Sequence, residues 1–96
     1  MQIQHKESGS GGIFFIPGDG DDTLAELTYQ QNGQGTIVID HTGVDKSYRG
    51  KDLGMELINQ AVEFARSQKM KILPVCPFAR AVMQKKSAYK DVYINA

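Results

Sequence analysis

The stretch TIVIDHTGVDKSYRGKDLGMELINQAVEFARS, residues 36–67, decides the fold of this chain. It opens with an apolar, β-branched run from Thr36 to His41, which is typical of a largely buried strand. A turn with several glycines follows. Apolar residues then recur at spacings of three and four, which predicts an amphipathic helix from about Leu53 to Lys69. The stretch therefore predicts a strand, a glycine-containing turn and a long helix in succession.

The flanking sequence predicts further short elements, separated by turn chemistry. Three strands are expected before this stretch, around Ile3–His5, Ile13–Ile16 and Leu24–Tyr29. A fifth strand, Lys71–Cys76, follows the long helix and should return parallel to the fourth strand. A short helix is expected from Phe78 to Lys86. The predicted fold is α+β, with a mixed, mostly antiparallel sheet and the order β-β-β-β-α-β-α.

Size and charge limit the possible functions. The chain has 96 residues, which suits one domain spanning residues 1–96. Eleven basic and eleven acidic residues give zero net charge, so we expect no general attraction to nucleic acid or to an anionic membrane. The sequence has no apolar run long enough to span a membrane and no apolar core of a secretory signal near its start. One cysteine cannot form an internal disulfide, so a cytoplasmic location is expected.

The segment Tyr48-Arg49-Gly50-Lys51-Asp52-Leu53-Gly54 joins the buried strand to the helix. Glycines let the backbone approach a ligand closely, and the free amides at a helix start favour a phosphate or pyrophosphate. Arg49 and Lys51 add positive charge. An ordinary helix start with two solvated cations explains the same residues about equally well.

This segment resembles motif A of the GNAT acetyltransferase superfamily, Gln/Arg-x-x-Gly-x-Gly/Ala, which wraps the pyrophosphate of coenzyme A. Arg49 matches its first position and Gly54 its last. Asp52 stands where the first glycine normally lies, and its carboxylate would repel a pyrophosphate unless it is directed away, for example as a helix cap. A specific subgroup of about a hundred residues is also similar, through His41-Thr42-Gly43-Val44 and Cys76-Pro77-Phe78. Together these motifs cover most of the chain.

The resemblance implies a minimal GNAT fold, in which the fourth and fifth strands splay apart and hold the pantetheine arm of acetyl-CoA between them. The implied cofactor-binding residues form two consecutive groups: Thr42, Gly43 and Val44 beside the arm, and Arg49, Gly50, Lys51, Asp52, Leu53 and Gly54 around the pyrophosphate. Larger GNAT domains carry two helices between their first two strands, whereas Glu7–Gly12 can hold only a turn here. The acceptor side is therefore expected to be open and suited to a large or extended substrate, or to be completed by a partner chain.

His41 and Cys76 are the candidate catalytic residues. Each is expected at the end of one of two neighbouring parallel strands, so both side chains could face the thioester. His41 could act as a general base on an amine, or it could activate Cys76 as a transient acyl acceptor. The alternative is that Cys76 is a small buried residue and His41 a polar residue at a strand end. The family resemblance favours the catalytic interpretation.

The predicted function is acetyl-CoA binding with N-acetyl transfer to an unidentified amine, which can be a small molecule or a macromolecule. The competing hypothesis is a non-catalytic CoA-binding or interaction module that retains the fold. No metal site is expected, because the two histidines and Cys76 do not have the spacing of zinc ligands.

Overall fold

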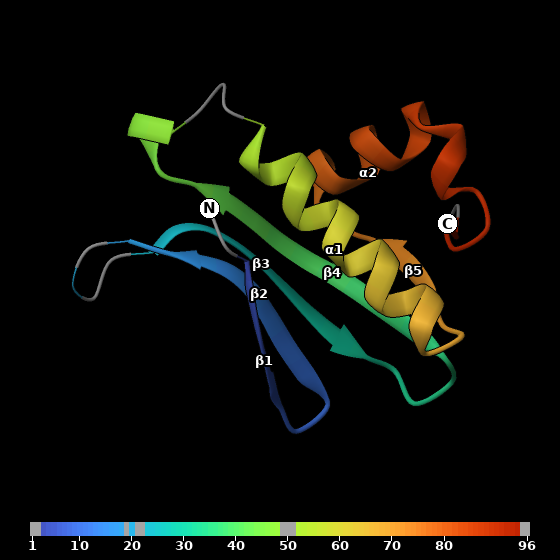
Figure 1. The fold of residues 1–96 in the computed structure, drawn as a ribbon. Helices are drawn as coiled ribbons and strands as arrows, with labels where there is room; N and C mark the ends of the chain where they lie inside the picture. Colours follow the sequence, from blue (N-terminus) through green and yellow to red (C-terminus); the bar gives the residue numbers. More distant parts are fainter. Residues whose placement is uncertain (1–2, 19, 21–22, 49–51, 95–96) are drawn as a thin grey trace.

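Five strands form one sheet, and their order in space is their order along the chain (Figure 1). The computed structural model describes residues 3–18, 20, 23–48 and 52–94. The strands are β1 (Gln4–Ser8), β2 (Gly11–Pro17), β3 (Thr23–Gln31), β4 (Thr36–Val44) and β5 (Lys71–Pro74). The first four pair antiparallel and β5 pairs parallel to β4, which confirms the predicted mixed sheet.

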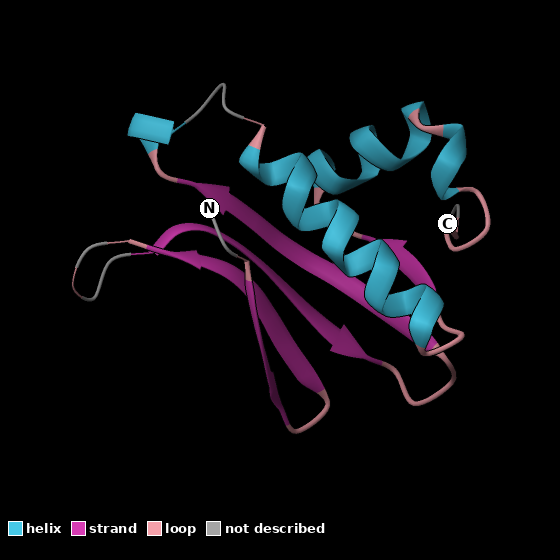
Figure 2. Cartoon of the chain, in the orientation of Figure 1, coloured by secondary structure: helices cyan, strands magenta, loops and turns pink. Residues whose placement is uncertain are grey.

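The helices lie on one face of this sheet (Figure 2). They are α1 (Leu53–Ser67) and α2 (Pro77–Lys85), with short 3-10 turns η1 (Lys46–Tyr48) and η2 (Ser87–Tyr89). The buried stripe of α1 packs on β2, β3, β4 and β5, as its three-and-four spacing predicts. Neither described α-helix has the length and apolar character needed to span a bilayer.

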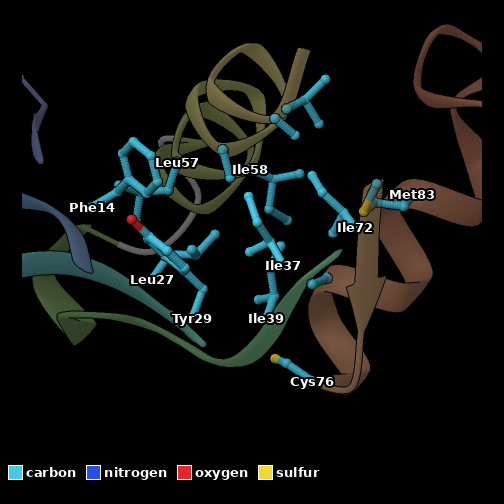
Figure 3. Close-up of a cluster of buried hydrophobic side chains, with 14 of the residues drawn as sticks. Phe14, Leu27, Tyr29, Ile37, Ile39, Leu57, Ile58, Ile72, Cys76 and Met83 are labelled. Carbon is cyan, nitrogen blue, oxygen red and sulfur yellow. The ribbon is translucent and has the colours of Figure 1, made fainter. Parts of the chain in front are cut away.

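The core lies between the helices and the sheet (Figure 3). Its central members come from three elements: Leu27 and Tyr29 on β3, Ile37 and Ile39 on β4, and the buried face of α1. Met83 of α2 belongs to the same cluster, so both helices share one apolar layer. Alternation along the strands places the intervening residues on the opposite side of the sheet.

An aromatic cluster closes the core at the β1 edge. The His5 ring stacks on Phe14 at 4.0 Å between centroids and meets Phe64 of α1 edge-on at 4.7 Å. Its Nε2 lies 2.5 Å from the hydroxyl of the fully buried Tyr29. Burial lowers the pKa of His5, which the charge of Glu7 partly opposes, and burial also raises the pKa of Tyr29 to about 12. Both groups are therefore neutral near pH 7. Their hydrogen bond and ring contacts hold β1 against the core.

The C-terminal segment covers the outer edge of β5. The amide of Ile72 donates to the Val92 carbonyl at 2.6 Å, and the amide of Ile94 donates to the Ile72 carbonyl at 2.8 Å. Arg66 of α1 holds this segment with a two-pronged bond to Asp91, at 2.8 and 2.9 Å. An unpaired strand edge is a site for unwanted pairing, and this segment covers part of it.

Candidate active site

The pairing between β4 and β5 ends halfway along β4. They pair in parallel only from Thr36 with Lys71 to Ile39 with Pro74. The amides of Val75 and Cys76 then both donate to the Ile39 carbonyl, at 2.9 and 3.1 Å, and the chain turns into α2. Beyond Ile39, the β5 side of β4 faces a gap, because β5 has ended.

The backbone of β4 presents hydrogen-bonding groups to this gap. The amide of Asp45 donates to Leu24 of β3, so Asp45 directs its backbone groups toward β3. Directions alternate along an antiparallel pair, and Gly43 therefore also faces β3. Thr42 and Val44 direct their amides and carbonyls the other way, into the gap. The Thr42 amide reaches Cys76 there, so a ligand can bond to the Thr42 carbonyl and to the backbone groups of Val44 as an added strand would.

Cys76 lies at the inner end of the gap, on the helix side. It is buried, it is the N-cap residue of α2, and its Sγ lies 2.8 Å from Thr42 Oγ1. Burial alone would raise the pKa of this thiol, but the Thr42 hydroxyl and the backbone amides of Ala79, Phe78 and Thr42 outweigh burial and lower it. These donors favour a thiolate, which is the reactive form of cysteine. The pKa of Cys76 is lowered because the Thr42 hydroxyl, the amides at the start of α2 and the Thr42 amide all reach one sulfur.

His41 lies on the other face of the sheet. It pairs with Thr28, whereas Thr42 pairs with the buried Leu27 and so shares the helix face with Cys76. The His41 ring extends over Gly43, with Nε2 3.1 Å from the position that a Cβ atom on Gly43 would occupy. The structure thus does not bring His41 and Cys76 together on one face, contrary to the expectation from the sequence. It also shows that β4 does not end at His41 but continues to Val44.

A bulge in β4 is the physical reason for this difference. Tyr29 pairs with Ile39 and Thr28 with His41, so Asp40 is an extra residue in β4. Regular alternation from Ile39 would direct His41 toward the helices. The extra residue reverses this, so that Asp40 and His41 both face away from the helices and Thr42 faces toward them.

A pocket adjoins the outer end of the gap. It has a volume of about 340 Å³ and is lined by residues from the end of β4, from η1 and from the starts of both helices: Val44, Tyr48, Asp52, Leu53, Gly54, Met55 and Phe78. Gly54 is needed for this shape, because a Cβ there would lie 2.7 Å from the Phe78 ring. The first turn of α1, with its unbonded amides, therefore opens directly onto the pocket.

The predicted pyrophosphate segment is only partly described. Arg49, Gly50 and Lys51 lie outside the described residues. Asp52 occupies the N-cap position of α1 with a left-handed backbone (φ 57°), and its side chain makes no capping hydrogen bond. The expectation that its carboxylate caps the helix is therefore not met. Asp52 is exposed, and its unusual backbone conformation is one that aspartate tolerates better than most residues.

Three contributors to the site were not among the predicted site residues. Tyr48, Met55 and Phe78 line the pocket beside the expected Leu53 and Gly54. Tyr48 directly precedes Arg49, and Phe78 ends the Cys76-Pro77-Phe78 segment, which is the sequence signal that could have identified these two residues. Among the residues that the structure describes, no three His, Cys, Asp or Glu side chains form a group suited to a metal ion.

Comparisons with known proteins identify the family that has this fold. The model of the GCN5-related N-acetyltransferase family matches residues 13–92, which include β4, α1, β5 and α2. The NMR structure of a GCN5-like protein from Staphylococcus aureus, described as a candidate N-acetyltransferase, is 35% identical with a TM-score of 0.77. That match covers 97% of this chain and 89% of that one. The chain therefore belongs to the GCN5-related N-acetyltransferase family.

Two more distant structures share the fold. A candidate streptothricin acetyltransferase from Bacillus anthracis, solved with acetyl coenzyme A, is 24% identical with a TM-score of 0.56, over 68% of this chain and 37% of that one. The ribosomal-protein-S18-alanine N-acetyltransferase from Escherichia coli is 14% identical with a TM-score of 0.66, over 81% and 52%. This chain thus spans about half or less of these larger relatives. A search of curated proteins finds no match.

Proposed function

We propose that the protein binds acetyl-CoA in the gap between β4 and β5 and transfers the acetyl group to an amine. One observation carries the proposal: β4 continues past the end of β5 and directs the backbone groups of Thr42 and Val44 into the gap. Membership of an N-acetyltransferase family supports the same reading. The thioester would lie near Cys76, and the rest of the arm would follow β4 toward the pocket.

The start of α1 is the proposed site of the pyrophosphate. A helix of fifteen residues carries partial positive charge at its N-terminus, where the amides of its first turn have no partner within the helix. Arg49 and Lys51 would add charge to this end, as the motif implies. Asp52 and Glu56 carry charges here that oppose binding, and both residues are exposed, so solvent screens these charges.

The proposed direct reaction needs a base on the acceptor side. The amine nitrogen attacks the carbonyl carbon of the thioester, a C–N bond forms, the C–S bond breaks and coenzyme A leaves as its thiolate, which solvent protonates. His41 would take the proton that the amine loses. Its position on the face away from the helices suits an amine that approaches from that face.

The covalent alternative uses Cys76. Its sulfur would attack the same carbonyl, release coenzyme A and carry the acetyl group until an amine removes it. The lowered pKa of the thiol supports this route. His41 is not placed to take the Cys76 proton, because the two side chains lie on opposite faces of β4.

Titration with acetyl-CoA, followed by NMR of backbone amides, tests binding. We expect the largest shifts at Thr42, Val44 and Gly54, because the Val44 and Gly54 amides face the proposed ligand and the Thr42 amide bonds to Cys76 beside it. The Lys6 amide on β1, at the opposite edge of the sheet, provides the internal control. Unchanged signals at Thr42 and Val44 at millimolar acetyl-CoA would refute the proposed function, including its non-catalytic form.

Mass spectrometry of the intact protein separates the two routes. With the covalent route, incubation with acetyl-CoA should add one acetyl group to Cys76, and Cys76→Ser should lower turnover at least about a hundredfold. With the direct route, no acetyl group should appear on Cys76 and the variant should keep turnover within about threefold. Ala88→Ser, an exposed change beyond α2, is the matched control for a new hydroxyl group. Binding of acetyl-CoA without turnover on any amine would leave the non-catalytic module as the function.

A further inference from the structure

The face of the sheet opposite the helices, here called the open face, is not covered by any helix that the structure describes (Figure 1). Alternation from the buried residues assigns its members: Ile13 and Phe15 on β2, Glu26 and Thr28 on β3, and Asp40 and His41 on β4. Lys6 of β1 confirms the assignment, since its Nζ lies over the Phe15 ring, 5.4 Å from the centroid. This face borders the gap proposed for the thioester.

Two carboxylates flank His41 on the open face. Glu26 pairs with Gly43, the residue over which the His41 ring extends. Asp40 is the extra residue of the bulge, and its Oδ1 accepts a hydrogen bond from the Thr28 hydroxyl at 2.5 Å. That bond fixes the direction of the Asp40 side chain, while both carboxylates remain accessible. An amine that approaches the gap from this side meets negative charge on both sides of the imidazole.

The bulge and the glycine make this arrangement possible. Without the bulge, His41 would face the helices, and Asp40 alone would face out. Without a glycine at position 43, a Cβ would lie 3.1 Å from His41 Nε2 and crowd the ring. Both features therefore place an imidazole between carboxylates, at the point where β4 leaves β5.

We propose that the open face docks a flexible polypeptide segment that presents a free amine, with Glu26 and Asp40 attracting the ammonium group beside His41. This inference rests on the proposed acetyl transfer. Charge complementarity selects a cationic acceptor, because Glu26 and Asp40 place two carboxylates beside His41 on this face. The shape of the face selects an extended acceptor. Small-molecule sites are concave, whereas this face is one side of an open sheet, with apolar Ile13 and Phe15 beside the charges.

The probe is a ten-residue unstructured peptide with a free N-terminal amine and no lysine. Its N-acetylated form and alaninamide are the comparison ligands. We expect the free peptide to shift the amide signals of Thr28, Asp40 and Gly43, and to bind at least about ten times more tightly than alaninamide. The signals of Asn59 and Glu63 on α1 should not move. This measurement does not depend on acetyl-CoA, so it distinguishes failure of the docking surface from failure of the proposed function.

Variants sharpen the test. Glu26→Gln and Asp40→Asn should each weaken peptide binding about threefold, and together about tenfold, with no change in acetyl-CoA binding. Asp40→Asn keeps an oxygen that can accept the Thr28 hydroxyl. Glu63→Gln, on the exposed side of α1, is the matched control and should leave peptide binding unchanged. Equal binding of alaninamide and the peptide, or an unaffected double variant, would overturn the proposal.

Discussion

Gly54→Val is expected to weaken acetyl-CoA binding by about thirtyfold. The first turn of α1 opens onto the 340 Å³ pocket at Gly54, and a Cβ there would lie 2.7 and 2.8 Å from two atoms of the Phe78 ring. Valine must push this ring into the pocket or enter the pocket itself. Acetyl-CoA must then push the ring or the valine back out of the pocket, into the overpacked arrangement. Overpacking of this kind costs about 2 kcal/mol, which is about thirtyfold in a binding constant. Isothermal titration with acetyl-CoA measures the loss.

A second variant tests the cause of that effect. Phe78→Ala removes the ring that Gly54 contacts, so Gly54→Ala combined with Phe78→Ala should bind acetyl-CoA more tightly than Gly54→Ala alone. The thermal midpoint of each variant shows whether the fold is kept, since alanine is also the better helix former. If Gly54→Val bound acetyl-CoA within threefold of the wild type, the pocket would not be part of the cofactor site.

Gly12→Ala should lower the free energy of unfolding by about 3 kcal/mol, the largest stability effect expected from a single methyl group here. The added Cβ would overlap the phenol oxygen and ring of Tyr29, which is fully buried and bonded to His5. Tyr29 cannot move away without disturbing Phe14 and Phe64. Urea unfolding measures the change.

Two controls separate overlap from the general effect of losing a glycine. Gly33 has open space around its Cβ position and a φ of 80°, so Gly33→Ala should cost only about 1 kcal/mol, from backbone strain. Tyr29→Phe in the Gly12→Ala background removes the nearest atom and should recover part of the loss. A Gly12→Ala protein as stable as Gly33→Ala would show that the cluster at the β1 edge is loosely packed.

Most of the fold could be predicted from the sequence, because the residue patterns that predict its helices and strands are local. Spacing of three and four residues predicts α1, and six of the seven residues on its predicted apolar face are buried in the observed helix, whereas Phe64 is half-buried and Gly54 is buried in addition. The parallel return of β5 followed from the helix that precedes it. The end of α1 was placed two residues late, at Lys69 rather than Ser67. Lys69 has a φ of 57°, which ends the helix, and lysine as a residue type does not predict a positive φ.

The site was less predictable, and Asp40 shows why. Which face of a strand a side chain occupies depends on the count of residues along it, and one inserted residue reverses every later position. The sequence Ile39-Asp40-His41-Thr42 reads as simple alternation. The bulge is visible only in the pairing with β3, and it exchanges the faces of His41 and Thr42. The contact of Thr42 with Cys76, and the separation of His41 from it, follow from that one residue.

The matching of strand order to chain order has a consequence for how the molecule assembles. The three antiparallel pairs are each closed by a short connection, such as the two residues between β1 and β2. Among the strands, only β5 pairs with its neighbour across a long connection, which runs from the end of β4 through all of α1. Closing a longer loop costs more entropy, and contacts distant in sequence slow folding. The meander can therefore form early from nearby segments, whereas the part of the molecule that holds the proposed site forms only after the closure across α1.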